Sequence, residues 1–282
     1  MFQSHSFGTS TFISTNNGRR LHYMVKGEGS PTVVFESGLG FSRSTWGLVH
    51  PAIAKATRAV VYDRAGLGKS EPDDKPRTLA RMADDLSCLL DALGPGPFIL
   101  VGHSWGGPMI RVAASRNLAR IRGLILVDPS DEQCDLYFAP ASQRQFALNR
   151  LLLPPLARLG LYRLLGSIPG RAQPDDVYKE HRREDFTVRS AKTAAAESDL
   201  FLTELAALRE TPPFLGNTEI SIITGTKITW MERKVRPAVM KAHQKSVSAL
   251  PNGRWVEASS SGHLINFSEP QLIIHEIMGM IH

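Results

Sequence analysis

The sequence predicts an α/β fold, in which helices cover both faces of a mostly parallel sheet. Short apolar runs, such as TVVFES (32–37) and FILVGH (98–103), alternate along the chain with amphipathic segments such as 78–93. Parallel strands that are buried on both faces form continuous apolar runs, and helices usually connect them. The alternation stops near residue 130 and resumes near residue 216. An all-helical segment is therefore expected to interrupt the sheet.

Periodicity and turn residues predict the individual elements. The first two strands lie within 11–27 and are joined at Asn17-Gly18, a dipeptide that favours hairpin turns. Later strands are expected at 32–37, 58–63, 98–103, 122–128, 219–226 and 254–259. Helices are expected at 44–56, 78–93 and 108–116, and in the C-terminal segment PQLIIHEIMGMI.

Length and composition restrict the function classes. A chain of 282 residues, 42% hydrophobic and 21% charged, is long enough for one large domain with an inserted subdomain. The net charge of +6 is dispersed, as in 116–122 and 231–241, and no nucleic-acid-binding motif accompanies it. The two cysteines form neither a disulfide framework nor a metal-ligand pattern. Without a signal peptide or a membrane-spanning stretch, we expect a cytoplasmic protein with no nucleic-acid, membrane, cofactor or metal partner.

The segment ILVGHSWGGPMI (99–110) indicates a catalytic serine. Gly102-His103-Ser104-Trp105-Gly106 fits the pattern G-x-S-x-G, between an apolar strand and a helix. Glycines at 102 and 106 suit a turn so tight that a side chain would clash there. The helix that follows points unpaired backbone N–H groups at any anion that forms beside Ser104. A serine hydroxyl is a weak nucleophile on its own, so a base, an acid and an oxyanion hole are also needed.

Five segments resemble the α/β-hydrolase superfamily: ESGLGFSRSTW, YDRAGLGKS, GHSWGG, LVDPS and SSGHLINFSEP. The resemblance covers nearly the whole chain. It implies an eight-stranded sheet with a helical cap after the sixth strand. We therefore predict a core domain, 1–129 with 216–282, and a cap subdomain, 130–215. The residues Asp63 and Arg64 of DRAGLGKS are interpreted as fixing their loop, because the P-loop spacing is absent.

His263 is the predicted base. It lies in SGHLINFSEP, after the last predicted strand and before the last helix, with small residues beside it. The chain order nucleophile, acid, histidine places the base there. His103 neighbours Ser104 but points the opposite way on an extended backbone, so a structural role is expected for it.

The predicted acid departs from the commonest family pattern. That pattern has a carboxylate three residues beyond the glycine of the seventh strand, where this chain has Ile228. Some family members draw the acid from the end of the sixth strand, where GLILVDPS offers Asp128 followed by Pro129. Asp128 is therefore predicted to orient the imidazole. The reserve candidates are Asp131, Glu132 and Glu232.

The oxyanion hole is predicted by position. One donor is the backbone N–H of Trp105, and resemblance to the family's His-Gly loop assigns the other to Leu39 in SGLG (37–40). Gly38, Gly40 and Trp46 are candidates for lining the substrate pocket.

Together these residues predict a serine hydrolase acting on a small or medium carboxylic ester or a lactone. One alternative is an aminopeptidase of the proline-releasing type, which would bind a free amine with cap carboxylates. The candidates for that role are Glu180, Glu184, Asp185, Glu197, Asp199 and Glu204. Another is a non-catalytic ligand receptor on the same fold. The physiological substrate and the choice between monomer and homodimer stay open.

Overall fold

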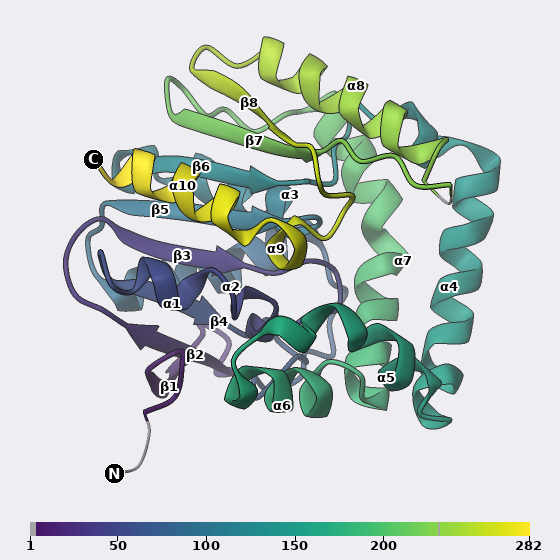
Figure 1. Cartoon of the computed structure of the whole chain (residues 1–282), viewed down its shortest axis with the longest axis horizontal. Coiled ribbons are helices and arrows are strands. Elements are labelled where there is room, and N and C mark those ends of the chain that lie inside the picture. The colour runs from purple at the N-terminus through teal and green to yellow at the C-terminus, as the bar shows by residue number, and fades with distance from the viewer. Residues whose placement is uncertain (1–3, 231) are drawn as a thin grey trace.

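A computed structural model describes residues 4–230 and 232–282 of the chain. Its eight strands are β1 (Thr9–Ser14), β2 (Arg20–Lys26), β3 (Thr32–Glu36), β4 (Ala59–Tyr62), β5 (Phe98–His103), β6 (Ile121–Val127), β7 (Glu219–Gly225) and β8 (Gly253–Ala258). They form one sheet in the order β1-β2-β4-β3-β5-β6-β7-β8 (Figure 1). β2 pairs antiparallel with β1 and β4, and all other pairs are parallel. The carboxyl ends of the parallel strands therefore meet at one edge.

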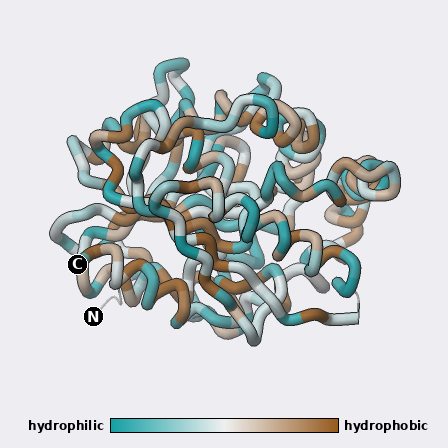
Figure 2. The backbone as a smooth tube through the Cα atoms, turned by 90° about the horizontal axis from the view of Figure 1, so that it is seen from above, coloured by the Kyte–Doolittle hydropathy of each residue, from teal (hydrophilic) through white to brown (hydrophobic). Residues whose placement is uncertain are grey.

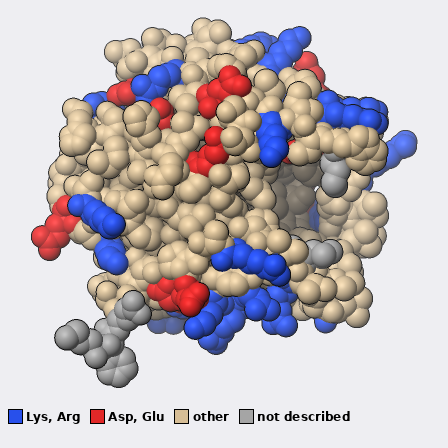
Figure 3. Space-filling view, in the orientation of Figure 1, with Lys and Arg blue, Asp and Glu red and all other residues tan. Residues whose placement is uncertain are grey.

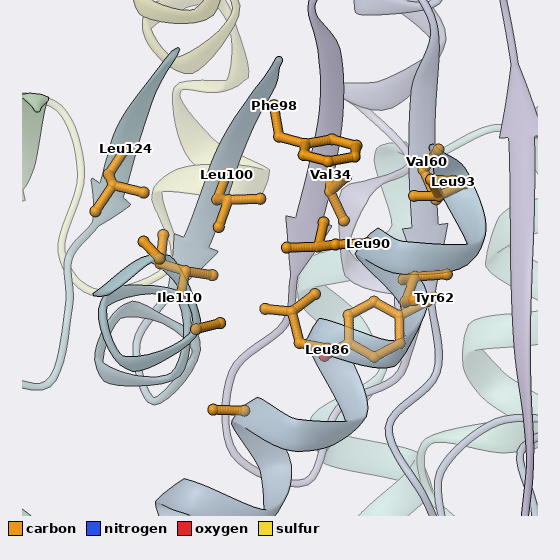
Figure 4. Packing of buried hydrophobic residues seen from close by; sticks show 14 of the residues in the cluster. Val34, Val60, Tyr62, Leu86, Leu90, Leu93, Phe98, Leu100, Ile110 and Leu124 are labelled. Carbon is orange, nitrogen blue, oxygen red and sulfur yellow. The ribbon is translucent and has the colours of Figure 1, made fainter. Parts of the chain in front are cut away.

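Helices cover both faces of the sheet. They are α1 (His50–Ile53), α2 (Leu79–Leu93), α3 (Gly106–Arg116), α8 (Val235–Ser248), α9 (Ile265–Ser268) and α10 (Pro270–Ile281). Alternate strand residues separate into two cores. Val34, Val60 and Leu100 pack against α2 and α3 (Figure 4), whereas Val33 and Val101 pack towards α1 and α10. This division explains the continuous apolar runs, and the hydrophobic stretches of the chain accordingly pass through the middle of the molecule (Figure 2).

The segment between β6 and β7 is helical. It contains α4 (Pro140–Arg158), α5 (Leu161–Gly166), α6 (Asp175–Glu184) and α7 (Val188–Glu210), with short 3-10 turns between some of them. Figure 1 shows these helices beside the edge at which the parallel strands end. The fold class predicted from the sequence is confirmed, while the division into a core domain and a cap domain at 130 and 215 stays a prediction. None of the helices in the described ranges is both long enough and apolar enough to cross a bilayer.

The helix expected over 44–56 differs from the structure. Two short elements replace it, a 3-10 turn (Arg43–Trp46) and α1. Gly47 separates them, and its N–H donates to the side chain of Gln173 in the helical segment (3.0 Å). Pro51 stands in the first turn of α1, because a proline is tolerated there and not in a helix interior.

Candidate active site

Ser104 occupies a strained turn between β5 and α3. Its φ is +52°, in the left-handed region that a residue with a side chain rarely adopts. A Cβ on Gly102 would lie 2.6 Å from the carbonyl oxygen of Gly106, and a Cβ on Gly106 would lie 2.7 Å from that of Glu36. The two glycines are thus required by close backbone approach. The Ser104 backbone is held by an N–H donated to the carbonyl of Val127 (3.0 Å).

His263 lies on the loop between β8 and α9 and faces Ser104. Its Nδ1 donates to Oδ2 of Asp128 (2.6 Å), because an ionised carboxylate can only accept. The Nε2 atom is thereby left as an acceptor, 3.0 Å from the Ser104 Oγ. The side chain is 41% exposed, so an incoming molecule can reach it. The structure therefore brings the predicted nucleophile and base into hydrogen-bonding distance.

Asp128 completes this chain of hydrogen bonds from the end of β6. It is buried, and its Oδ1 accepts from Nη1 of Arg236 (2.6 Å) and from the N–H of Gly225 (3.1 Å). Burial alone would raise the pKa of Asp128, but the His263 hydrogen bond and charge, with a smaller contribution from Arg236, hold that pKa well below its ordinary range. The carboxylate is therefore ionised at neutral pH and fixed on both oxygens.

Backbone strain coincides with this site. Among the described residues, Ser104 (φ +52°) and Asp128 (φ +41°) are the two that have a positive φ without being glycine. Such conformations cost on the order of 1–3 kcal/mol each and persist only where the surroundings hold them. Here two backbone hydrogen bonds hold the strained residues. The N–H of Asp128 donates to the carbonyl oxygen of Ile223 (2.7 Å), and the carbonyl oxygen of Ser104 accepts from the N–H of Ser130 (3.0 Å).

His103 contacts the site although its side chain points away from Ser104. It is buried, and its Nε2 donates to the backbone carbonyl of His263 (3.0 Å). Burial, with the neighbouring His263 adding to it, lowers the pKa of His103 to about 3, so the ring stays neutral. The structural role expected from the sequence therefore includes support of the His263 loop.

The three reserve carboxylates do not reach His263. Glu132 forms a two-bond ion pair with Arg111 (2.7 and 2.8 Å), and Asp131 accepts the N–H of Gln133 (2.8 Å). Both line a groove of about 440 Å³ between α3 and α8 that Ser104 does not border. Glu232 accepts from the hydroxyl of Thr229 (3.0 Å). Asp128 is thus the carboxylate that the fold places on the imidazole.

The two predicted oxyanion donors flank Ser104. Trp105 follows it directly, and the loop carrying Leu39 lies over it, since a Cβ on Gly38 would lie 3.3 Å from the Ser104 Cβ. Among the described residues, no acceptor takes the backbone N–H of Leu39 or of Trp105. Both N–H groups are consequently available to a ligand oxygen beside Ser104.

A buried ion pair holds the loop that carries Leu39. Arg64 donates to the carbonyls of Ser37 and Gly38 (both 2.7 Å), and Glu197 of α7 accepts the N–H of Gly40 (2.9 Å). Arg64 and Glu197 also bond to each other (2.9 and 3.0 Å), and both are buried. Burial would raise the pKa of Glu197, but the Arg64 and Arg77 charges outweigh it and lower that pKa. The sequence analysis predicted that Arg64 fixes its own loop, whereas its side chain holds the loop beside Ser104.

Two of the three pocket-lining predictions need correction. Trp46 is 0% exposed and packs in the core with its ring 5.0 Å from that of Phe35, so it does not face a pocket. Gly40 (φ +73°) faces α7, because a Cβ there would lie 2.4 Å from the Cβ of Ala194. Gly38 is the candidate that lies against Ser104. The spacing of Trp46 alone could not distinguish a core residue from a pocket residue.

Three contributors to this site escaped the sequence analysis. Arg236 on α8 appeared only within the dispersed basic segment 231–241, Glu197 on α7 appeared only as a possible amine-binding carboxylate, and Arg77 carried no signal at all. Each acts on a partner at least 100 positions away, for example Arg236 on Asp128, 108 positions apart. In the described ranges, no group of three or more His, Cys, Asp or Glu side chains could hold a metal ion.

Comparison with known proteins identifies the family. The model of the alpha/beta hydrolase family matches residues 33–276, so the chain belongs to that family. A curated relative is the protein YqjL of Bacillus subtilis, 25% identical over 250 residues, which are 88% of this chain and 82% of YqjL.

Solved structures share the fold at low sequence identity. An esterase from Thermogutta terrifontis superposes with a TM-score of 0.73 at 21% identity, covering 96% of this chain and 97% of the esterase. The epoxide hydrolase CorEH superposes with a TM-score of 0.68 at 21% identity, covering 96% and 98%. These similarities establish the fold, and the reaction has to be argued from the site.

Proposed function

We propose that this protein is a serine hydrolase that transfers the acyl group of a small or medium carboxylic ester, or of a lactone, to water. The hydrogen-bonded chain from Ser104 through His263 to Asp128 is the observation that carries the proposal. Strain at Ser104 and Asp128 supports it, because strained residues cluster at functional sites.

The proposed reaction has two steps. In the first, the Ser104 Oγ bonds to the substrate carbonyl carbon while His263 takes the hydroxyl proton. The carbonyl oxygen becomes an oxyanion and accepts from the N–H groups of Leu39 and Trp105. Asp128 stabilises the imidazolium that forms. The bond to the alkoxide then breaks, and His263 protonates the leaving oxygen.

In the second step, water hydrolyses the acyl-enzyme. His263 removes a proton from a water molecule, whose oxygen bonds to the acyl carbon. A second oxyanion forms at the same donors and collapses with cleavage of the bond to Ser104, which regains its proton from His263. The products are a carboxylic acid and an alcohol, or a hydroxy acid from a lactone.

A serine at position 104 favours ester over epoxide chemistry. Family members that open epoxides or remove halides use an aspartate at the equivalent of Ser104 and form an alkyl-enzyme. A seryl oxygen instead suits attack on an acyl carbon. The fold shared with an epoxide hydrolase therefore does not extend the proposal to epoxides.

The aminopeptidase alternative loses support because five of its six candidate carboxylates already have partners, Glu204 being the exception among the described residues. Glu180 and Glu184 pair with Arg43 (2.5 and 2.8 Å), Asp185 with His181 (2.7 Å), and Glu197 with Arg64. Asp199 pairs with Arg150. A free amine would have to displace these cations. We also propose a cytoplasmic location, consistent with free thiols at Cys88 and Cys134.

The test is hydrolysis of p-nitrophenyl esters of increasing acyl length, with proline p-nitroanilide as the aminopeptidase probe. Ser104→Ala should lower kcat about 10³-fold or more, since it removes the atom that forms the acyl-enzyme. Ser248→Ala, an exposed serine on α8, is the matched control and should keep full activity. Asp128→Asn should also lose most activity.

Each failure has a distinct meaning. Unchanged ester turnover in Ser104→Ala would end the proposal, and wild-type protein that turns over no probe would favour the ligand receptor. Turnover of proline p-nitroanilide alone would favour the aminopeptidase. Full activity of Asp128→Asn would assign the acid to Asp131, Glu132 or Glu232.

A further inference from the structure

One face of α4 carries a stripe of exposed leucines. Its members are Leu148, Leu151, Leu152, Leu156 and Leu159, which are between 37% and 73% exposed. They recur every three or four residues, a spacing that places them on one side of a helix. The opposite side of α4 packs on α7, where the ring of Phe146 lies 5.0 Å from that of Phe201. Most of the stripe therefore points away from the body of the protein, while Leu152 and Leu156 lie at its margin, towards α7.

The exposed apolar surface continues beyond α4. Leu161 and Leu164 of α5 and the neighbouring Ile168 are 43%, 66% and 46% exposed. Eight exposed large apolar side chains within about two dozen residues are unusual for a surface in contact only with water, and such a concentration is typical of an interaction site. We call this set, with the arginines described next, the outer surface.

The charge of the same segment has one sign. Between Asp135 and Asp175 the sequence contains five arginines and no lysine, aspartate or glutamate. Arg150 pairs with Asp199 of α7. The other four are exposed, and none forms an ion pair within the part of the chain that the structure describes: Arg144, Arg158, Arg163 and Arg171.

We infer that the outer surface docks the protein onto an anionic lipid surface. Leucine side chains that enter the boundary between headgroups and acyl chains, with arginines reaching the anionic headgroups, are the pattern of peripheral amphipathic helices. A second copy of the chain fits less well, because a symmetric contact would place five arginines against five arginines with no carboxylate from either segment. The charge of the segment thus selects an anionic partner, and its leucines select an apolar one.

A groove extends from the outer surface to the loop that carries Leu39, beside Ser104. It has a volume of about 420 Å³, lies between α4 and α7, and is lined mainly by apolar side chains. Leu152 and Leu156 of the stripe border it on one side, and Leu39 of the loop beside Ser104 borders it on another. Figure 3 also shows a deep hollow to the right of centre, bordered mostly by uncharged and basic surface. If the proposed function holds, an apolar ester carried in the lipid surface would have a route to Ser104.

Vesicle co-sedimentation tests the docking without depending on catalysis. The full chain carrying Ser104→Ala, which leaves substrate uncleaved, is mixed with vesicles of phosphatidylcholine alone or with about 30 mol % phosphatidylglycerol. We expect binding to the anionic vesicles that weakens with added salt, and little binding to the neutral ones.

Two sets of substitutions locate the contact. Exchanging Arg144, Arg158 and Arg163 for Gln should lower the partition coefficient about 100-fold, since each basic residue near an anionic membrane contributes about 1 kcal/mol. Leu151→Ser with Leu159→Ser should lower it at least about tenfold by removing the inserted apolar groups. The matched control exchanges three exposed cations elsewhere, Lys55, Arg183 and Lys241, for Gln, and it should bind as before.

Several results would overturn the inference. They are equal binding to neutral and anionic vesicles, no binding to either, or an equal loss in the control triple variant. A further overturning result would come from sedimentation velocity. It would be a dimer of the unaltered protein that is absent in the leucine variant, although both bind vesicles equally. Ester turnover by the serine-containing protein is measured separately, so a failure of the proposed function leaves the docking result interpretable. The sequence analysis expected no membrane partner because the chain lacks a membrane-spanning stretch. Binding to anionic vesicles would replace that expectation.

Discussion

The helical segment between β6 and β7 has two halves that meet different surroundings. The anchored half, α6 and α7, directs carboxylates onto core arginines: Glu180 and Glu184 onto the fully buried Arg43, and Glu197 onto Arg64. The outer half, α4 and α5, contains no carboxylate and exposes its leucines. The anchored half is therefore fixed to the core, because buried charges require fixed partners. The outer half has no such requirement, because exposed apolar groups need no partner.

The anchored half also shapes the candidate active site. Glu197 is the link, since one carboxylate accepts the N–H of Gly40 and pairs with Arg64, which holds the carbonyls of Ser37 and Gly38. The geometry of the loop beside Ser104 therefore depends on the position of α7. Substitutions and acid should therefore affect the two halves differently.

The largest effect is expected from Glu197→Gln. It removes the charge that neutralises the buried Arg64 and Arg77, so the free energy of unfolding should fall by about 3 kcal/mol. The kcat for esters should fall by about tenfold or more, because Arg64 then holds the loop of Leu39 less firmly. Urea unfolding and steady-state kinetics measure the two effects.

Glu204→Gln is the matched control for that substitution. Glu204 stands on the same helix, is half-exposed, and forms no ion pair with a described residue. Equal losses in the two variants would show that α7 does not anchor the loop through Glu197.

Gly40→Ala should act next most strongly. Its φ of +73° strains an alanine, and the new Cβ would lie 2.4 Å from that of Ala194 on α7. Strain and overpacking together should lower the free energy of unfolding by about 2 kcal/mol and reduce kcat. Gly18→Ala separates the two causes, because Gly18 has a φ of +82° with no atom within 4 Å of its Cβ position. A similar loss in both variants would contradict the close contact with α7.

Acid should loosen the anchored half before the outer half. Burial would raise the pKa values of Glu180 and Glu197, but His5, Arg43 and Lys69 lower that of Glu180, and Arg64 and Arg77 lower that of Glu197. Their stabilisation is present above the ordinary glutamate pKa of 4.5 and is lost as the pH falls below it. Glu184 acts in the opposite direction. Burial raises its pKa in the folded protein, so its protonation at low pH stabilises the fold and offsets part of this loss.

Hydrogen exchange at pH 7 and below pH 4.5 checks that prediction. Protection in α7 should fall relative to α4, and the Glu197→Gln variant should show a smaller change in α7. Equal loss of protection in both helices would mean that the carboxylates of the anchored half do not set its acid response.

The smallest effect on folding is expected in the outer half. Leu151→Ser with Leu159→Ser should change the free energy of unfolding by no more than about 0.5 kcal/mol per site, because the side chains are already exposed. Urea unfolding in the absence of lipid measures this. A loss of more than about 2 kcal/mol would indicate that the stripe packs against protein in solution.

Some parts of the fold followed from local sequence patterns. Each strand was predicted within a few residues, because a strand buried on both faces needs a continuous apolar run that can be recognised within a short window. Ser104 was located by its motif at the end of such a strand, whereas Asp128 and His263 were assigned from strand ends together with the chain order of the family that the sequence resembles. The helix over 44–56 was wrong in detail, since the contact of Gly47 with Gln173 lies outside any local window.

The sequence by itself determined the order of strands and helices, the tight turn around Ser104, and the loops that carry Asp128 and His263. Only the tertiary structure decided that Asp128 contacts His263, that Trp46 is core, that Arg236 and Glu197 support the site, and that the leucines of α4 face outward. The physical reason is range. Periodicity and turn chemistry act over a few residues, whereas ion pairs and burial join residues more than 100 positions apart, as Arg64 and Glu197 are, 133 positions apart.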